Sequence, residues 1–195
     1  MFAKKLGLAV SALFLSTSAF ARQSDVLVNA GYSNYSGFSD SAFKNNFNGG
    51  NLGVTYLYSI MNEKMTPVVG AGLNTHLMRY SNDSGSNLTL NSYEGALKAG
   101  AKFNVVDKIN AFALLNAGYS FYNYFAASYD KGDLKLKNTY SFGASFIATY
   151  DLSESLNVGL GYAYNRRNLN VKDTDLDKNY QYNEHSANVI VGFNF

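Results

Sequence analysis

Apolar and polar residues alternate along most of the chain, and most regularly over its last fourteen residues, 182–195. From Ala187 to Phe195, every second residue is apolar or small. The residues between them are polar or glycine, with Ile190 as the one exception. A period of two predicts a β-strand with one apolar and one polar face. At this length the strand exceeds the ~5–6 residues usual in globular proteins.

Seven further segments with the same alternation precede this one. They span residues 25–34, 47–58, 66–79, 92–104, 109–124, 139–150 and 156–167. The connections alternate between long polar stretches (35–46, 80–91, 125–138 and 168–181) and short turns (59–64, 105–108 and 151–155). This order predicts eight antiparallel strands in an up-and-down arrangement. The segment 109–124 is the least regular, because Phe112 and Leu114 fall on its polar face.

The first 21 residues follow a different pattern. Lys4 and Lys5 precede an apolar run over residues 6–15, and the small-x-small triplet 19–21 follows it. This order predicts a secretory signal peptide that is cleaved after Ala21. The apolar run is too short for a membrane helix, which needs ~20 residues, and the absence of cysteine excludes a lipoprotein anchor. We therefore divide the chain into a signal peptide, residues 1–21, and one mature domain, residues 22–195.

The composition of the mature chain narrows the functional classes. Without Lys4 and Lys5, the mature chain has 14 basic and 14 acidic residues, so its formal net charge is zero. A nucleic-acid partner is not expected, because it would require a basic face. An exported chain without cysteine has no disulfide framework. Since the mature chain also lacks an apolar stretch of 18 residues, a closed β-barrel is the way for it to enter a bilayer.

Periodicity alone does not tell which face of the barrel is inside. A soluble carrier would turn its apolar face inward, and a membrane barrel would turn it outward. The polar face is dense in Gly, Asn and Ser and carries charges of both signs deep in the strands. Eight strands enclose only enough room for side chains. These features favour a membrane barrel with a packed polar interior.

Aromatic residues cluster near the predicted strand ends. Such residues form girdles at the two membrane interfaces, although aromatics are also common in the strands of soluble proteins. The predicted girdles comprise Tyr58, Phe103, Tyr150, Phe193 and Phe195 near the turns and Tyr32, Tyr80, Tyr93, Phe121, Tyr140 and Tyr164 near the loops.

The signal peptide, the strand alternation, the loop–turn rhythm and the terminal Phe195 together resemble the small eight-stranded outer-membrane barrels of the opacity-protein, OmpA N-terminal and OmpX type. The resemblance covers the whole mature chain. It implies an all-β, eight-stranded antiparallel up-and-down transmembrane β-barrel in the outer membrane of a Gram-negative bacterium. It also implies contact with outer-membrane lipid and lipopolysaccharide, and assembly by a machinery that reads Phe195.

The same resemblance implies a surface role. Four extracellular loops would serve adhesion, surface integrity or evasion of host defence, and would meet a host ligand. We expect a monomer. A narrow porin-like channel for small solutes is the alternative, followed by a lipid-A-modifying enzyme.

Charged residues on the polar face predict ion pairs inside the barrel. If the last hairpin is centred near Asp175, Arg167 and Glu184 lie opposite each other near the extracellular end. An interior ion pair is expected there, since an unpaired buried charge is costly.

A second group lies on the third and fourth segments. If their hairpin is centred near residues 85–86, His76 lies about one step from Glu94 and Lys98. This group would be either a gate or acid–base pair, or a structural charge network, and the filled barrel favours the network. The expected interior network comprises His76, Glu94, Lys98, Lys102, Arg167 and Glu184.

No catalytic constellation stands out in the sequence. Lipid-A-modifying barrels carry a catalytic His and Ser on the barrel wall. Here His185 and Ser186 are adjacent and so point to opposite faces of a strand. Ser141 and Ser145 have no histidine nearby in the sequence. We therefore predict no catalytic, metal-binding or cofactor-binding residue, and no cofactor.

Overall fold

The computed structural model describes residues 24–37, 46–60, 64–81, 87–127, 135–173 and 176–195. Its elements are β1 (Ser24–Ser36), β2 (Phe47–Ser59), β3 (Met65–Ser81), β4 (Asn87–Val106), β5 (Ile109–Ala127), β6 (Lys135–Asp151), β7 (Leu156–Asp173) and β8 (Leu176–Asn194). The predicted signal peptide, residues 1–21, lies outside the described residues. Among the described residues, no helix is long and apolar enough to cross a membrane.

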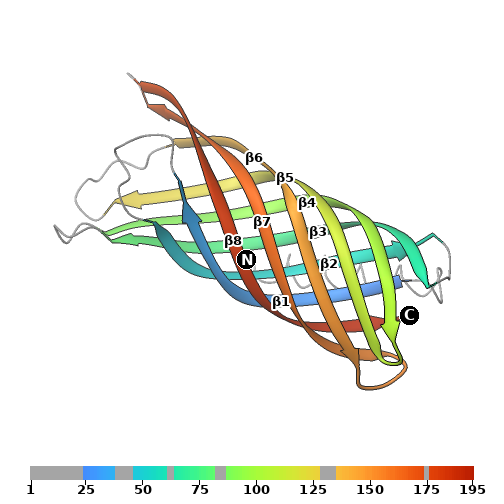
Figure 1. The fold of residues 1–195 in the computed structure, drawn as a ribbon. Coiled ribbons are helices and arrows are strands. Elements are labelled where there is room, and N and C mark those ends of the chain that lie inside the picture. The colour runs from blue at the N-terminus through green and yellow to red at the C-terminus, as the bar shows by residue number, and fades with distance from the viewer. Residues whose placement is uncertain (1–23, 38–45, 61–63, 82–86, 128–134, 174–175) are drawn as a thin grey trace, which may run out of the picture.

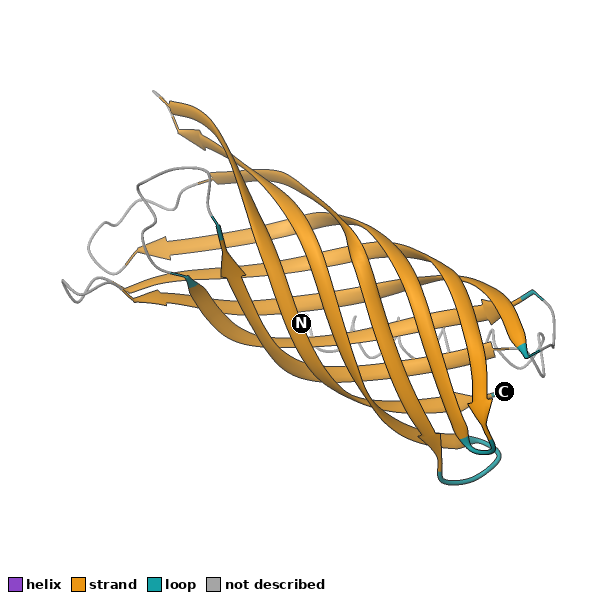
Figure 2. Cartoon of the chain, viewed as in Figure 1, coloured by secondary structure: helices purple, strands orange, loops and turns teal. Residues whose placement is uncertain are grey.

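Each strand pairs antiparallel with its neighbours in chain order, and β8 pairs with β1, which closes the sheet into a barrel (Figure 2). The closing ladder continues one residue beyond β8, where the amide of Phe195 donates to the carbonyl of Ser24 at 2.9 Å. Figure 1 shows the C-terminus at the end of the barrel that carries the turns after β4 and β6. The prediction of an eight-stranded antiparallel up-and-down barrel is confirmed.

Several strands extend into stretches that we expected to be loops. The ladder between β7 and β8 continues to Asp173 opposite Leu176, so strand structure occupies most of residues 168–181. Likewise β4 begins at Asn87 and β6 at Lys135, each several residues before the predicted start. A paired strand satisfies its backbone groups whatever its side chains are. The polar composition of these stretches therefore does not prevent strand formation.

The apolar flanks of the strands point outward. Phe142 is 64% exposed and Leu160 is 68% exposed, whereas Arg167, on the opposite flank of β7, is 1% exposed. Leu97 and Leu115 on β4 and β5 also face outward, at 69% and 70%. The predicted orientation, with apolar side chains outside and polar side chains inside, is therefore confirmed.

The interior is less uniformly polar than predicted. Seven buried apolar side chains form a turn-end apolar cluster inside the barrel: Leu27, Leu57, Val68, Phe112, Leu114, Ile147 and Ile190. Phe112, Leu114 and Ile190 are the residues that interrupted the alternation in the sequence. Side chains must fill a lumen of this width, and an apolar layer does so without needing hydrogen-bond partners.

A second layer of buried side chains lies inside the loop end. This loop-end aromatic layer comprises Tyr35, Phe47, Met78, Tyr80, Leu90 and Tyr182. The ring centroids of Tyr35 and Tyr182 are 4.9 Å apart, and those of Phe47 and Tyr80 are 5.1 Å apart. The placement of Tyr80 in an outer girdle was wrong. Tyr80 shares the inward side of β3 with Met78, so it packs in the lumen.

Candidate functional site: a buried charge cluster in the lumen

Between these two layers lies a central charge cluster of His76, Glu94, Arg167 and Glu184, which are all at most 5% exposed. The residues come from β3, β4, β7 and β8, respectively. In a closed ring of eight strands, β3 and β7 lie on opposite sides. The cluster therefore crosses the lumen and ties one wall of the barrel to the other.

Arg167 is the centre of the cluster, and each nitrogen of its guanidinium has a different partner. Nε donates to Glu184 Oε2 at 2.6 Å, and Nη1 donates to Glu94 Oε2 at 2.6 Å. Nη2 lies 3.1 Å from His76 Nε2, and the ring of Tyr35 covers the guanidinium at 5.7 Å. Among side chains, only the planar guanidinium of arginine carries N–H donors on three nitrogens and can contact three partners in this way.

Uncharged side chains also donate hydrogen bonds to the carboxylates of Glu94 and Glu184. Ser141 Oγ donates to Glu94 Oε2 at 2.9 Å. Glu184 accepts from Asn165 Nδ2 at 3.2 Å and from Ser186 Oγ at 2.9 Å. Buried carboxylates need such partners to offset the loss of water.

The ring of His76 lies between Arg167 and Glu184. Arg167 can only donate, so His76 Nε2 must accept and the ring proton must sit on Nδ1. Nδ1 lies 3.2 Å from Glu184 Oε1, a close contact whose alignment falls short of a hydrogen bond.

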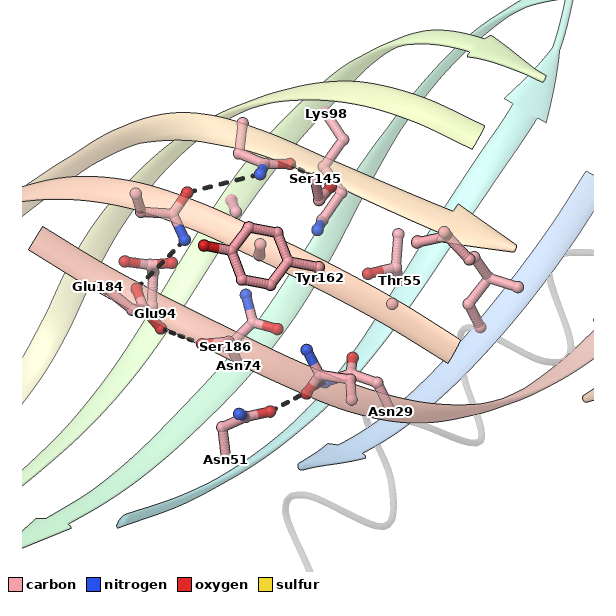
Figure 3. Close-up of a pocket in the computed structure, with 18 of the residues that line it drawn as sticks. Asn29, Asn51, Thr55, Asn74, Glu94, Lys98, Ser145, Tyr162, Glu184 and Ser186 are labelled. Carbon is pink, nitrogen blue, oxygen red and sulfur yellow. Dashed lines mark hydrogen bonds between the residues drawn. The ribbon is translucent and has the colours of Figure 1, made fainter. Parts of the chain in front are cut away.

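A cavity of about 70 Å³ lies among the cluster residues, and both polar side chains, such as Asn29, Asn74 and Lys98, and apolar ones, such as Leu27 and Ile147, line it (Figure 3). Lys98 supplies its cation, and among the described residues its ammonium forms no ion pair within 4 Å. In formal charge, the two cations Lys98 and Arg167 balance the two carboxylates Glu94 and Glu184.

The predicted register of the last hairpin was wrong by two residues. Arg167 lies opposite Tyr182, and Glu184 lies opposite Asn165, in a ladder that pairs Asp173 with Leu176. The side chains of Arg167 and Glu184 still meet, along a diagonal rather than straight across. Their ion pair depends on the length of the arginine side chain.

The second predicted group separates in the structure. His76 lies opposite Ser92, and Lys98 lies opposite Gly70, six residues further along β4 from Ser92. The expectation that His76 lies one step from Lys98 is therefore wrong. His76 and Glu94 meet instead through Arg167, which the sequence analysis had assigned to another pair.

Lys102 lies at the other end of the lumen, apart from the central charge cluster. Its ammonium donates to both carboxylate oxygens of Asp25, at 2.8 and 3.1 Å, and lies 5.3 Å from the ring centroid of Phe112. The predicted interior network did not include Asp25, Ser141 or Asn165. Strand parity places all three on the inward face, but it does not reveal neighbours across the lumen.

Within the described part of the chain, no group of three or more His, Asp or Glu residues could hold a metal ion. The chemistry that the cluster offers is charge neutralisation and bracing of the walls. No substrate or cofactor contact is needed to explain its geometry.

Gly118 provides the room that Glu94 occupies. A Cβ atom at Gly118 would lie 2.6 Å from Glu94 Cδ and 2.3 Å from Ser141 Oγ. We expect Gly118→Ala to lower the free energy of unfolding by about 1–3 kcal/mol through overpacking. Gly95→Ala is the matched control, because nothing lies within 4 Å of its Cβ position. Urea unfolding in micelles measures both variants, and equal stability of the two would contradict this account.

A closed eight-stranded barrel with an apolar outer flank and a filled polar lumen defines a small transmembrane β-barrel. The chain belongs to the family described as "Outer membrane protein beta-barrel domain", which matches residues 7–195. It is thus an outer-membrane protein of a Gram-negative bacterium. A comparison with curated protein sequences found no match.

Solved structures of the same fold resemble this chain. They include Neisserial surface protein A, with 12% identity, coverage of 88% of this chain and 97% of that chain, and a TM-score of 0.62. OprG of Pseudomonas aeruginosa has 12% identity, coverage of 89% and 97%, and a TM-score of 0.55. Ail, the attachment invasion locus protein of Yersinia pestis, solved with the heparin analogue sucrose octasulfate, has 14% identity, coverage of 89% and 99%, and a TM-score of 0.51. At these identities the similarity is one of fold.

Proposed function

We propose that this protein is a surface adhesin or host-contact protein whose barrel is a closed anchor and whose loop-end hairpins do the work. The observation that carries the proposal is the filled lumen. The loop-end aromatic layer, the central charge cluster and the turn-end apolar cluster occupy it at three successive levels. Function then falls to the surfaces outside the barrel.

The filled lumen argues against a porin-like channel. Tyr35 at one end and Phe112 at the other are both 1% exposed, and the cavity between the layers, about 70 Å³, holds only a few water molecules. We expect the purified protein to produce no stable openings in planar bilayers. Discrete, reproducible conductance from heat-modifiable, folded protein would favour the channel instead.

The arrangement of Ser, Glu and His in the lumen does not favour an enzyme. Ser186 and His76 both contact Glu184, so the carboxylate stands between them. In a hydrolytic triad the histidine must stand between serine and acid. All three residues are at most 5% exposed, which leaves no path for a lipid substrate.

The named relatives support a surface role by analogy of fold. One is called a surface protein, and another is called an attachment invasion locus protein and was solved with a polysulfated sugar. The present chain carries lysines in and beside its β5–β6 connection, at positions 131, 135 and 137. Such residues could meet an anionic host polymer or lipopolysaccharide.

Attachment can be measured in a non-adherent Gram-negative strain that displays the protein. We expect binding to host cells to rise above that of the empty strain. Replacement of residues 128–134 or 38–45 by Gly–Ser linkers should remove the gain, whereas replacement of residues 61–63, which connect β2 to β3 in the sequence, should not. Adherence equal to the empty strain, with the barrel assembled, would overturn the proposal.

A further inference from the structure

The outward face of β7 and β8 changes from apolar to polar towards the loop end. At Leu160 and Val189, which are 68% and 61% exposed, the face is aliphatic. Beyond them it becomes an outer polar ladder: Tyr162, Tyr164 and Arg166 on β7, and Gln181, Asn183 and His185 on β8. Polar side chains are costly against hydrocarbon and are favoured at the interface. The ladder therefore marks the level at which acyl chains give way to headgroups.

Three diagonal contacts order this ladder. The Tyr162 hydroxyl and His185 Nδ1 are 2.7 Å apart, and the Tyr164 hydroxyl donates to Asn183 Oδ1 at 3.0 Å. Arg166 Nη2 donates to Gln181 Oε1 at 2.6 Å. The rings of Tyr164 and His185 pack with centroids 5.1 Å apart. The side chains are thus held in place on the outside of the barrel before any ligand arrives.

Arg166 is the cation of this surface, and it differs from its buried neighbour Arg167. It is exposed, and it forms no ion pair with any described residue. Its hydrogen bond to the side-chain amide of Gln181 uses one of the five guanidinium N–H donors. The remaining N–H groups can therefore bind an anion through two hydrogen bonds.

Outward-facing polar residues continue from this ladder across the neighbouring paired strands. His185 lies opposite Asn34, Asn34 lies opposite Asn48, and Asn48 lies opposite Arg79. Asn34 donates to Asn48 Oδ1 at 2.7 Å, and Arg79 is exposed. A second outward arginine in this row of paired residues shows that the change from apolar to polar is not local to one hairpin.

We propose that the outer polar ladder binds a phosphate group on the lipid A headgroup of lipopolysaccharide, with the Arg166 guanidinium as the anion ligand. Short turns of outer-membrane barrels face the periplasm, so the loop end lies in the outer leaflet, where lipopolysaccharide resides. The hydroxyl of Tyr162 and the amide of Asn183 are placed to meet sugar hydroxyls beside the phosphate. This site rests on the membrane placement of the barrel and is independent of the attachment role.

Native mass spectrometry of the micellar protein, refolded without lipopolysaccharide, tests the site. The probes are bisphosphorylated lipid A and the same lipid A after removal of its phosphates. We expect Arg166→Gln to weaken binding of the phosphorylated form by about tenfold or more, the effect of one charge-assisted contact. Lys108→Gln, which removes an exposed cation from the β4–β5 turn, should bind like the wild type.

Two further arms keep the test decisive. Wild-type protein should bind dephosphorylated lipid A as weakly as the Arg166→Gln variant binds the phosphorylated form, a result that does not depend on any variant folding. Inorganic phosphate at the same concentration should not displace lipid A. Equal binding of both lipid A forms, unchanged binding by Arg166→Gln, or displacement by inorganic phosphate would each overturn the proposal.

Discussion

Replacing Arg167 with methionine is expected to lower the free energy of unfolding by about 3–5 kcal/mol, the cost of breaking a buried ion pair by removing one partner. The variant leaves Glu94 and Glu184 facing each other across the lumen without the guanidinium that now lies 2.6 Å from each. Urea unfolding in micelles, followed by the change in gel mobility between the folded and heated forms, measures the loss.

The neighbouring arginine provides a matched control for this variant. Arg166 is exposed and points away from the lumen, so Arg166→Met should cost little in lipopolysaccharide-free micelles. The double variant Arg167→Met, Glu184→Gln should recover part of the stability, because one cation, Lys98, and one carboxylate, Glu94, then remain in the middle of the lumen. Arg167→Lys should recover only part of it, since one ammonium cannot replace three donors aimed at three partners. Equal stability of the Arg167→Met and Arg166→Met variants would contradict the cluster's role.

An arginine placed at Leu160 is expected to lower the free energy of unfolding in lipid vesicles by about 2–4 kcal/mol. Leu160 is 68% exposed and stands in the outward apolar band, so the guanidinium would face acyl chains. Leu152→Arg is the control, because Leu152 lies in the turn after β6 and is similarly exposed, at 56%. There the expected cost is only about 0–1 kcal/mol, as it is near the membrane interface. Similar costs at both positions would mean that the band does not touch lipid.

Period-two alternation was sufficient to predict the strands and their order, and the small and charged residues on the polar face then predicted which face is inside. The alternation is informative because each strand separates lipid from the barrel interior. The polarity of each residue therefore indicates which of the two its side chain faces. Even the exceptions were informative, since Phe112, Leu114 and Ile190 proved to be members of the turn-end apolar cluster. Strand ends were less predictable, because β7 and β8 continue as a paired ladder where composition alone suggested a loop.

Contacts across the lumen could not be predicted from the sequence. Asp25 and Lys102 are 77 residues apart, and His76 and Arg167 are 91 residues apart. Their meeting depends on closure of the barrel and on the stagger of every ladder between them. A single-residue change in the position of a turn moves each pairing by two residues, as happened for Arg167 and Glu184.

The most direct test of the account is whether lipid touches the apolar flank. The chain contains no tryptophan, so a single introduced tryptophan reports on one position. We predict that brominated lipids strongly quench the fluorescence of Leu160→Trp and leave Phe112→Trp, inside the lumen, nearly unquenched. Strong quenching of Phe112→Trp together with a bright, unquenched Leu160→Trp would contradict the account.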